Sequence, residues 1–211
     1  LTNIASIFVG FGMYASMRVL PQVLQLPSST GYGLGQSILQ AGLWMAPAGI
    51  MMLLLSPVGG RLTDARGPKF TLVLGAMVIA AGYGVALLGM GSTWGILATG
   101  LVINSGVAFA YGAMPALIMG AVPQSETAAA NGFNALMRSL GTTIGAAVIG
   151  VVLSQMTTPL GAVAVPSESG FRVALILGAA AAAAVLYAAW TALRADDELW
   201  VADDPLSAPD A

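Results

Sequence analysis

Polar and charged side chains that interrupt long apolar runs are the residues of this sequence best able to do chemistry. They fall in three sets at helical spacing. Two are Tyr14, Arg18, Gln22 and Gln25, and Asn131, Asn134, Arg138 and Thr142; in a weaker third set, Asn104 and Tyr111 recur together with Ala108 and Pro115. Residues three or four apart lie on one face of a helix. Because a polar side chain exposed to lipid is costly, each set predicts a helix face that looks into a bundle or a watery cavity. These faces are the candidate lining of a small-molecule cavity.

Each set also has a plainer interpretation. Arg18 lies near the end of its apolar run, where it could reach the lipid headgroups instead of a cavity. Arg138 lies deeper, which favours a role in a cavity or between helices. Asn131 and Asn134 could be ordinary hydrogen-bonding partners between neighbouring helices. Periodicity alone leaves these alternatives open.

The composition assigns the chain to the membrane. Of its 211 residues, 57% are hydrophobic and only 8% are charged, whereas a soluble domain carries about a quarter charged residues. Cys and His are both absent, which excludes disulfides, thiol catalysis and Cys/His zinc sites, and we expect neither a metal nor a cofactor. The net charge of −2 offers no basic surface for nucleic acid.

The apolar runs predict six transmembrane helices, since a helix needs about 20 apolar residues to cross the hydrocarbon core. We place these spans near 3–25, 35–58, 70–90, 94–119, 127–155 and 170–193. The connections 26–34 and 156–169 are rich in Pro, Ser, Thr and Gly, as turns in water are. The end, 194–211, has the acidic composition of a disordered cytoplasmic tail. The chain opens at Leu1 inside an apolar run, so we expect either a part of a longer polypeptide or a chain whose start has been lost.

Basic residues set the predicted orientation. Residues 59–69 carry three basic side chains, and Arg194 follows the last span. Loops rich in Lys and Arg stay in the cytoplasm, and an even number of crossings separates these two sites. We therefore expect 59–69, 120–126, the N-terminus and the tail to lie on the cytoplasmic side of the plasma membrane.

The stretch 59–69 resembles the signature turn of the major facilitator superfamily, usually written G-x-L-[AG]-D-[RK]-x-G-[RK]-[RK]. The matching residues are Gly60, Leu62, Asp64, Gly67 and Lys69, and the departures are Thr63, Ala65 and Pro68, with Arg66 one place late. The resemblance implies a cytoplasmic gating loop made of Gly60, Asp64, Arg66, Gly67 and Lys69. In such a loop glycines would allow a tight reversal, and Asp64 could lie against the N-terminus of a neighbouring helix. The alternative is a basic turn that only fixes topology.

Two further stretches resemble the fourteen-span drug:proton antiporter family. One is Leu20-Pro21-Gln22-Val23-Leu24-Gln25, and the other runs from Gly112 through Pro123 to Gly141. They imply an all-α membrane protein whose residues 1–193 form the C-terminal six-helix half-bundle of a major facilitator transporter. The implied activity is multidrug or small-molecule efflux by proton antiport through alternating access. The implied partners are an N-terminal half on the same or a separate polypeptide, the lipid bilayer, a small-molecule substrate and protons.

Carboxylates are missing from the predicted spans. Every Asp and Glu falls in a predicted loop or end, whereas a proton-driven exchanger needs a titratable group in its path and Arg does not release its proton. We therefore expect the coupling carboxylate on a part of the protein outside this chain. Two embedded arginines also make an anionic or zwitterionic substrate an alternative to a cationic one.

Two other classes of function compete with transport. The chain could be an incomplete or degenerate six-helix membrane fragment without transport activity of its own, acting only with a partner half. An intramembrane enzyme is disfavoured, because no embedded acid/base pair, HExxH stretch or Ser-His arrangement is present.

Overall fold

Six long helices make up almost all of the structure. The computed structural model describes the backbone of residues 2–202 and the side chains of residues 2–191. The helices are α1 (Thr2–Gln25), α2 (Ile38–Arg66), α3 (Pro68–Gly89), α4 (Thr93–Met119), α5 (Thr127–Gln155) and α6 (Glu168–Ala202). Within the described residues, these six are long and apolar enough to cross a membrane. The prediction of an all-α membrane half-bundle with six spans is confirmed.

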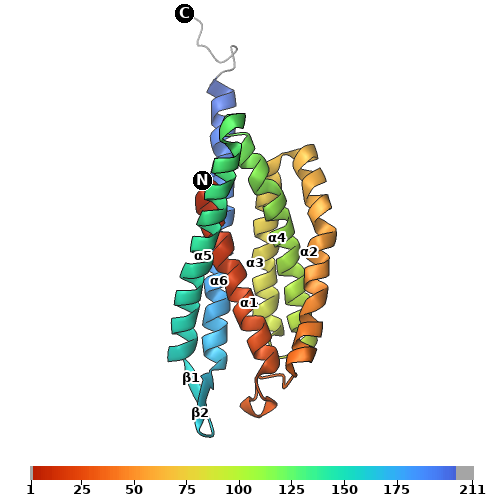
Figure 1. Cartoon of the computed structure of the whole chain (residues 1–211), viewed down its shortest axis with the longest axis vertical. Helices are drawn as coiled ribbons and strands as arrows, with labels where there is room; N and C mark the ends of the chain where they lie inside the picture. The colour runs from red at the N-terminus through yellow and green to blue at the C-terminus, as the bar shows by residue number, and fades with distance from the viewer. Residues whose placement is uncertain (1, 203–211) are drawn as a thin grey trace, which may run out of the picture.

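The helices form two layers (Figure 1). Helices α5, α1, α4 and α2 follow one another in a four-helix layer, since α1 packs on α5 and α4, and α4 packs on α2. Helices α6 and α3 form the second layer, where α6 packs on α1, α3 packs on α4, and the two pack on each other. Helices α2 and α5, at the two edges of the four-helix layer, are the least covered, with 11% and 22% of their spans buried.

Successive helices run in opposite directions, so their connections gather at two ends of the bundle. The start of α1, the α2–α3 junction, the α4–α5 connection with η2 (Gln124–Glu126) and the end of α6 lie at one end, shown at the top of Figure 1. The α1–α2 connection with η1 (Ser28–Thr30) and the α5–α6 connection lie at the other end. The segments expected on one side of the membrane thus share one end of the molecule. That this end faces the cytoplasm stays a prediction.

The expected loop at 59–69 was wrong in extent. Helix α2 continues through Arg66, and the chain reverses at Gly67 alone, which has φ +85 and ψ 156. Pro68 then occupies the first turn of α3, where its missing N–H is not needed. At the other end, α2 starts later than expected, at Ile38, because Ser37 and Gln40 form a capping box there.

The last helix is also longer than expected. Helix α6 begins at Glu168 and continues to Ala202, so residues 194–202 of the expected disordered tail are helical. A run of alanines around 179–184 and the high helix propensity of alanine favour this long helix. The rest of the expected tail, 203–211, lies outside the described residues.

The connection 156–169, expected to be a turn, contains a β-hairpin. Strand β1 (Thr157–Leu160) pairs antiparallel with β2 (Val163–Pro166), and Gly161 takes a positive φ of 63 in the turn between them. The Tyr32 hydroxyl donates a hydrogen bond to the Pro166 carbonyl, which ties the α1–α2 connection to the hairpin. Burial, and secondarily the Glu168 carboxylate, raise the pKa of Tyr32 above its ordinary value.

Small residues allow the helices of the four-helix layer to approach closely. A Cβ placed on Gly145 of α5 would lie 3.3 Å from the Phe11 carbonyl oxygen on α1, and one on Gly112 of α4 would lie 3.3 Å from the Gly59 carbonyl carbon on α2. Small residues at such contacts let the backbones approach closely, since an added Cβ would be tighter than most real contacts. They hold α5 and α2 against the two central helices of the layer.

Candidate functional site

Polar side chains connect three helices of the four-helix layer at two successive levels. At the first level, the buried Asn134 of α5 donates from Nδ2 to Asn3 Oδ1 (3.1 Å) and to Ser6 Oγ (2.6 Å) on α1. The Ser6 hydroxyl lies in turn 3.4 Å from the Met114 sulfur on α4. An amide in an apolar bundle needs such partners; both partners of Asn134 lie on α1, and Ser6 extends the contacts to α4.

The second level lies one turn further along α5. The guanidinium carbon of Arg138 lies 4.8 Å from the centroid of the Tyr111 ring on α4, within the range of a cation–π interaction. The Tyr111 hydroxyl lies 3.1 Å from the Met13 sulfur on α1, to which it donates. We call the residues of both levels the polar seam: Asn3, Ser6, Met13, Tyr111, Met114, Asn134 and Arg138.

Arg138 places a permanent charge near the middle of its span. It lies 11 residues beyond Thr127, the first residue of α5 (138 − 127), which is about 16 Å along the helix at about 1.5 Å per residue. Helix α5 has 29 residues, or about 43 Å at the same rise, so Arg138 lies in the middle third of the helix. Residues of this kind inside spans line cavities or pair with one another. Arg138 is half-buried, and within residues 2–191 its described partner is the Tyr111 ring.

The structure brings together some of the predicted cavity residues. Tyr111, Asn134 and Arg138, from two of the three predicted sets, all belong to the polar seam. Asn104 and Asn131 instead donate to carbonyls of their own helices, at Gly100 (2.8 Å) and Thr127 (3.0 Å). This i to i−4 bonding satisfies part of each amide locally.

The set predicted on α1 lies apart from the seam contacts. Arg18 is exposed, and Tyr14 is half-buried beside Gly145 of α5. The Gln22 side chain keeps a buried Oε1 atom without a hydrogen-bond partner in the described part of the chain. The seam uses a different part of α1, at Asn3, Ser6 and Met13.

These α1 residues were missed by sequence reasoning. Asn3 and Ser6 are three apart and Met13 is seven further on, so they share a helix face, which is the available signal. Serine is common between packed transmembrane helices, and methionine reads as an ordinary apolar residue. Met114 on α4 was missed for the same reason.

The residues of the predicted gating loop lie on the end of α2 and the start of α3. Asp64 and Arg66 are exposed on the last turns of α2, and the Arg66 guanidinium carbon lies 5.2 Å from the Phe70 ring centroid. Gly60 faces open space, with nothing within 4 Å of an added Cβ. The tight reversal falls on Gly67.

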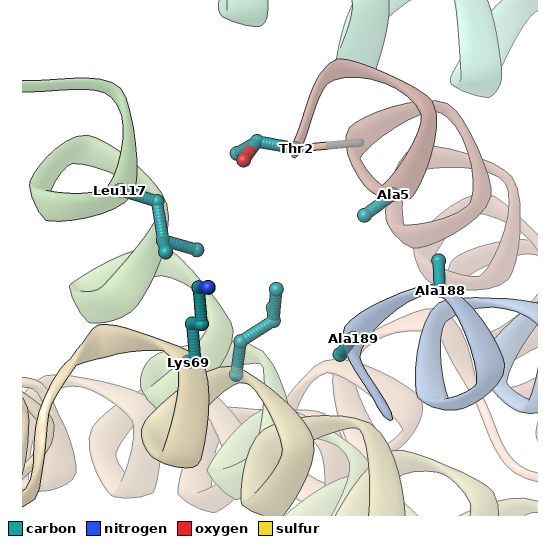
Figure 2. A pocket seen from close by; sticks show the side chains of 7 residues that line it. Thr2, Ala5, Lys69, Leu117, Ala188 and Ala189 are labelled. Atoms are coloured by element: carbon teal, nitrogen blue, oxygen red, sulfur yellow. The ribbon is translucent and has the colours of Figure 1, made fainter. Parts of the chain in front are cut away.

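Lys69 lines a small cavity at the same end of the bundle. The cavity has a volume of about 30 Å³ and lies between α1, α3, α4 and α6. The side chain of Lys69 reaches from α3 towards Thr2 and Leu117, with Ala188 and Ala189 of α6 opposite (Figure 2). A cavity of this size holds a water molecule rather than a drug.

Six helices that are long and apolar enough to cross a membrane define a multi-pass membrane protein. The family model described as Major Facilitator Superfamily matches residues 2–205, and the chain belongs to that superfamily.

Several curated relatives are multidrug transporters by name. The chain is 30% identical over 181 residues to the Multidrug resistance protein B homolog of Mycobacterium tuberculosis, with 80% of this chain and 32% of that protein covered. It is 28% identical over 218 aligned residues to the Multidrug efflux pump LfrA of Mycolicibacterium smegmatis, covering 100% of this chain and 41% of that protein. It is 26% identical over 155 residues to the Multidrug resistance protein Stp of Mycobacterium tuberculosis, covering 73% and 27%. The chain thus spans about a third of the length of the curated relatives it matches.

Proposed function

We propose that this chain is the C-terminal six-helix half of a small-molecule efflux transporter of the fourteen-span type, driven by proton antiport through alternating access. The observation that carries the proposal is the polar seam, which holds a permanent charge in the middle third of α5. A bundle surrounded by lipid would lose stability by keeping such a residue. In a bundle that forms one wall of a substrate path, the same charged residue can contact water or substrate.

The uneven covering of the helices supports the existence of a second half. Helices α2 and α5 have 11% and 22% of their spans buried, compared with 50% for α1. Since the chain covers about a third of its relatives, a further set of helices is available in proteins of this kind to cover the four-helix layer. Two such halves rocking about a site at mid-depth would give alternating access.

The cavity wall in this proposal is built around Tyr111, Asn134 and Arg138. Tyr14, Arg18, Gln22, Asn104 and Asn131 are the further candidates for the same wall. Arginine stays protonated, so the seam can contact substrate but cannot carry the coupling proton. The proton site then belongs to the half that this chain does not contain.

Transport is tested with the full-length protein that contains this chain. Cells lacking their own efflux pumps are loaded with fluorescent dyes, and dye loss is followed with and without a proton ionophore. We expect efflux that the ionophore abolishes. Normal expression without energy-dependent efflux of any dye would refute the proposal.

The alternative, a six-helix fragment acting only with a partner half, is tested in the same cells. Expression of residues 1–211 alone is compared with co-expression of the missing half. Efflux restored only by co-expression supports a two-part transporter. No efflux in either case, with both parts in the membrane, supports a fragment without transport activity.

We also propose that the end of the bundle with Gly60, Asp64, Arg66, Gly67 and Lys69 is the cytoplasmic gate. The chain has no cysteine, so a single introduced one reports its own position. In intact cells, a membrane-impermeant thiol reagent should label Gly161→Cys at the hairpin tip and should not label Asp64→Cys. Labelling of position 64 from outside, with position 161 protected, would reverse the orientation.

A further inference from the structure

Arg138 is held in place by its surroundings before any ligand arrives. A Cβ on Gly10 of α1 would lie 3.1 Å from the Arg138 carbonyl carbon, so the backbone of α5 rests directly on α1 at this level. The guanidinium then lies against the Tyr111 ring of α4, with 4.8 Å between its carbon and the ring centroid. Tyr111 is itself tied to α1 through Met13. The charge is therefore positioned by three helices.

Within residues 2–191, the partner described for Arg138 is the Tyr111 ring, a cation–π contact rather than a hydrogen bond. A guanidinium has five N–H donors, and in this part of the chain none of them is described with a hydrogen-bond acceptor. The carboxylate nearest to Arg138 in the sequence is Glu126, just before α5 and 12 residues away (138 − 126), or about 18 Å at about 1.5 Å per residue. The donors match a carboxylate or phosphate, which an arginine binds with two parallel hydrogen bonds.

A methionine lies beyond the aromatic ring, on α1. The Tyr111 hydroxyl donates to the Met13 sulfur, and Met13 is half-buried. Methionine is flexible and polarisable, and it suits surfaces that accept ligands of different shapes. The combination of a fixed cation, an aromatic ring and a half-buried methionine fits a molecule with an apolar body and one negatively charged group.

We propose that Arg138, held against Tyr111, binds an anionic group of the transported molecule, so that amphiphilic anions and zwitterions are substrates. This inference rests on the proposed transport function and narrows its substrate class. The competing occupant is a carboxylate side chain of the other half, which the same donors could bind. The two occupants predict different effects of removing Arg138. If the arginine binds substrate, only the transport of substrates with a negatively charged group should be affected.

The test compares two dyes with the same xanthene ring system, the anion carboxyfluorescein and the cationic ester of tetramethylrhodamine. Efflux of each is measured in the full-length transporter and in its Arg138→Gln variant, at matched surface expression. We expect Arg138→Gln to raise the half-saturating concentration of the anionic dye by about tenfold or more, as for loss of a charge-assisted hydrogen bond, and that of the cationic dye by less than about twofold. Arg172→Gln is the matched control. It removes an exposed arginine paired with Glu168 at the start of α6, and should change the half-saturating concentration of neither dye.

Three further variants separate the contribution of the guanidinium from that of the Tyr111 ring. Arg138→Lys keeps the charge but loses the planar fork, so we expect it to restore part of the preference for the anionic dye. Tyr111→Leu removes the ring that positions Arg138, whereas Tyr111→Phe keeps it. We expect Tyr111→Leu to raise the half-saturating concentration of the anionic dye more than Tyr111→Phe does.

The outcomes separate this inference from the proposed function. If the wild type expels the cationic dye and Arg138→Gln leaves the preference between dyes unchanged, the inference is wrong and the transport proposal stands. If Arg138→Gln abolishes efflux of both dyes at normal expression, the residue pairs with the other half and the inference is again wrong. If the wild type expels neither dye nor any other, the transport proposal itself fails.

Discussion

The contact between α1 and α5 gives the sharpest prediction about stability. Gly141 of α5 is buried, and a Cβ added there would lie 2.7 Å from the Ile7 carbonyl carbon and 2.9 Å from its Cα. Ordinary contacts of a Cβ begin at 3.4 Å, so Gly141→Ala requires the two backbones to separate by at least about 0.7 Å (3.4 − 2.7), because the Ile7 carbonyl oxygen lies closer still. The neighbouring atoms belong to the backbone of α1, which cannot move aside as a flexible side chain can.

The expected magnitude follows from two opposing terms. Forcing an extra methyl group into a packed interface costs about 1–3 kcal/mol, whereas replacing glycine by alanine within a helix gains up to about 1 kcal/mol. Gly132→Ala on the same helix is the matched control, because an added Cβ there meets nothing within 4 Å. Both variants gain the stability that alanine adds to a helix, and only Gly141→Ala also carries the cost of the close contact. We expect Gly141→Ala to be about 1–3 kcal/mol less stable than Gly132→Ala.

Thermal unfolding of the purified full-length protein in one detergent, followed by tryptophan fluorescence, measures this difference. Gly132→Ala should melt at or slightly above the wild-type temperature, and Gly141→Ala clearly below it. Equal melting temperatures for the two alanine variants would mean that α1 and α5 do not touch at Gly141. The arrangement of the polar seam, which lies between the same helices, would then also be wrong.

Three further predictions concern hydrogen bonds. Tyr83→Phe removes the hydroxyl that donates to the Gly12 carbonyl in the buried contact of α3 with α1, and should lower the free energy of unfolding by about 0.5–1.5 kcal/mol, measured by thermal unfolding in detergent. Asn134→Ala breaks the first level of the seam and should cost about 0.6–2 kcal/mol in the same assay; an unchanged melting temperature would contradict the described contacts. Because burial raises the pKa of Tyr32, its hydrogen bond to Pro166 should stabilise the contact between the α1–α2 connection and the hairpin fully below its ordinary pKa of about 10. This contribution should be lost as pH rises through the raised value. Protease sensitivity of the β1–β2 hairpin should therefore increase only at strongly alkaline pH, and a Tyr32→Phe variant, which lacks both the bond and the titration, should be equally sensitive on both sides of the transition.

The span count was predictable from sequence because it depends on one strong and local signal. Each crossing needs about 20 apolar residues, and the runs that meet this length coincide with the six helices. The exact ends were less predictable, since they depend on caps. The start of α2 moved to Ile38 because of the Ser37–Gln40 capping box, a short polar pattern next to a long apolar run.

The site was predictable only where a helix face carried its own polar pattern. Asn134 and Arg138 are four residues apart on α5, which predicted that they share a helix face. The structure places both in the polar seam. Their partners on α1 come from a contact between the first and fifth helices. No periodicity in either helix specifies which helices meet, so the helix face shared by Ser6 and Met13 did not reveal which helix it contacts. The glycines that let α5 lie on α1 determine that these two helices meet.

Connections were the least predictable part of the fold. The hairpin at 157–166 contains Pro159 and Pro166, and proline in a short stretch argues against a strand. Two-stranded pairing tolerates them because each strand is an edge strand, with one side free of ladder bonds. The hairpin is then supported by a tertiary contact, the hydrogen bond from Tyr32, which lies more than a hundred residues away in the sequence.

The glycines before the α2–α3 junction show why a turn was expected there and why a helix forms instead. Gly59 is buried where α2 crosses α4, and a Cβ on it would lie 3.3 Å from the Ala108 carbonyl oxygen, so this glycine serves a contact between helices. Only Gly67, at φ +85, has a conformation that other residues rarely adopt, and the reversal is confined to it. Asp64 is therefore carried on the end of a continuous helix. Since a helix moves as a unit, any gating motion of Asp64 must be a motion of α2, and α2 is the least covered of the six spans.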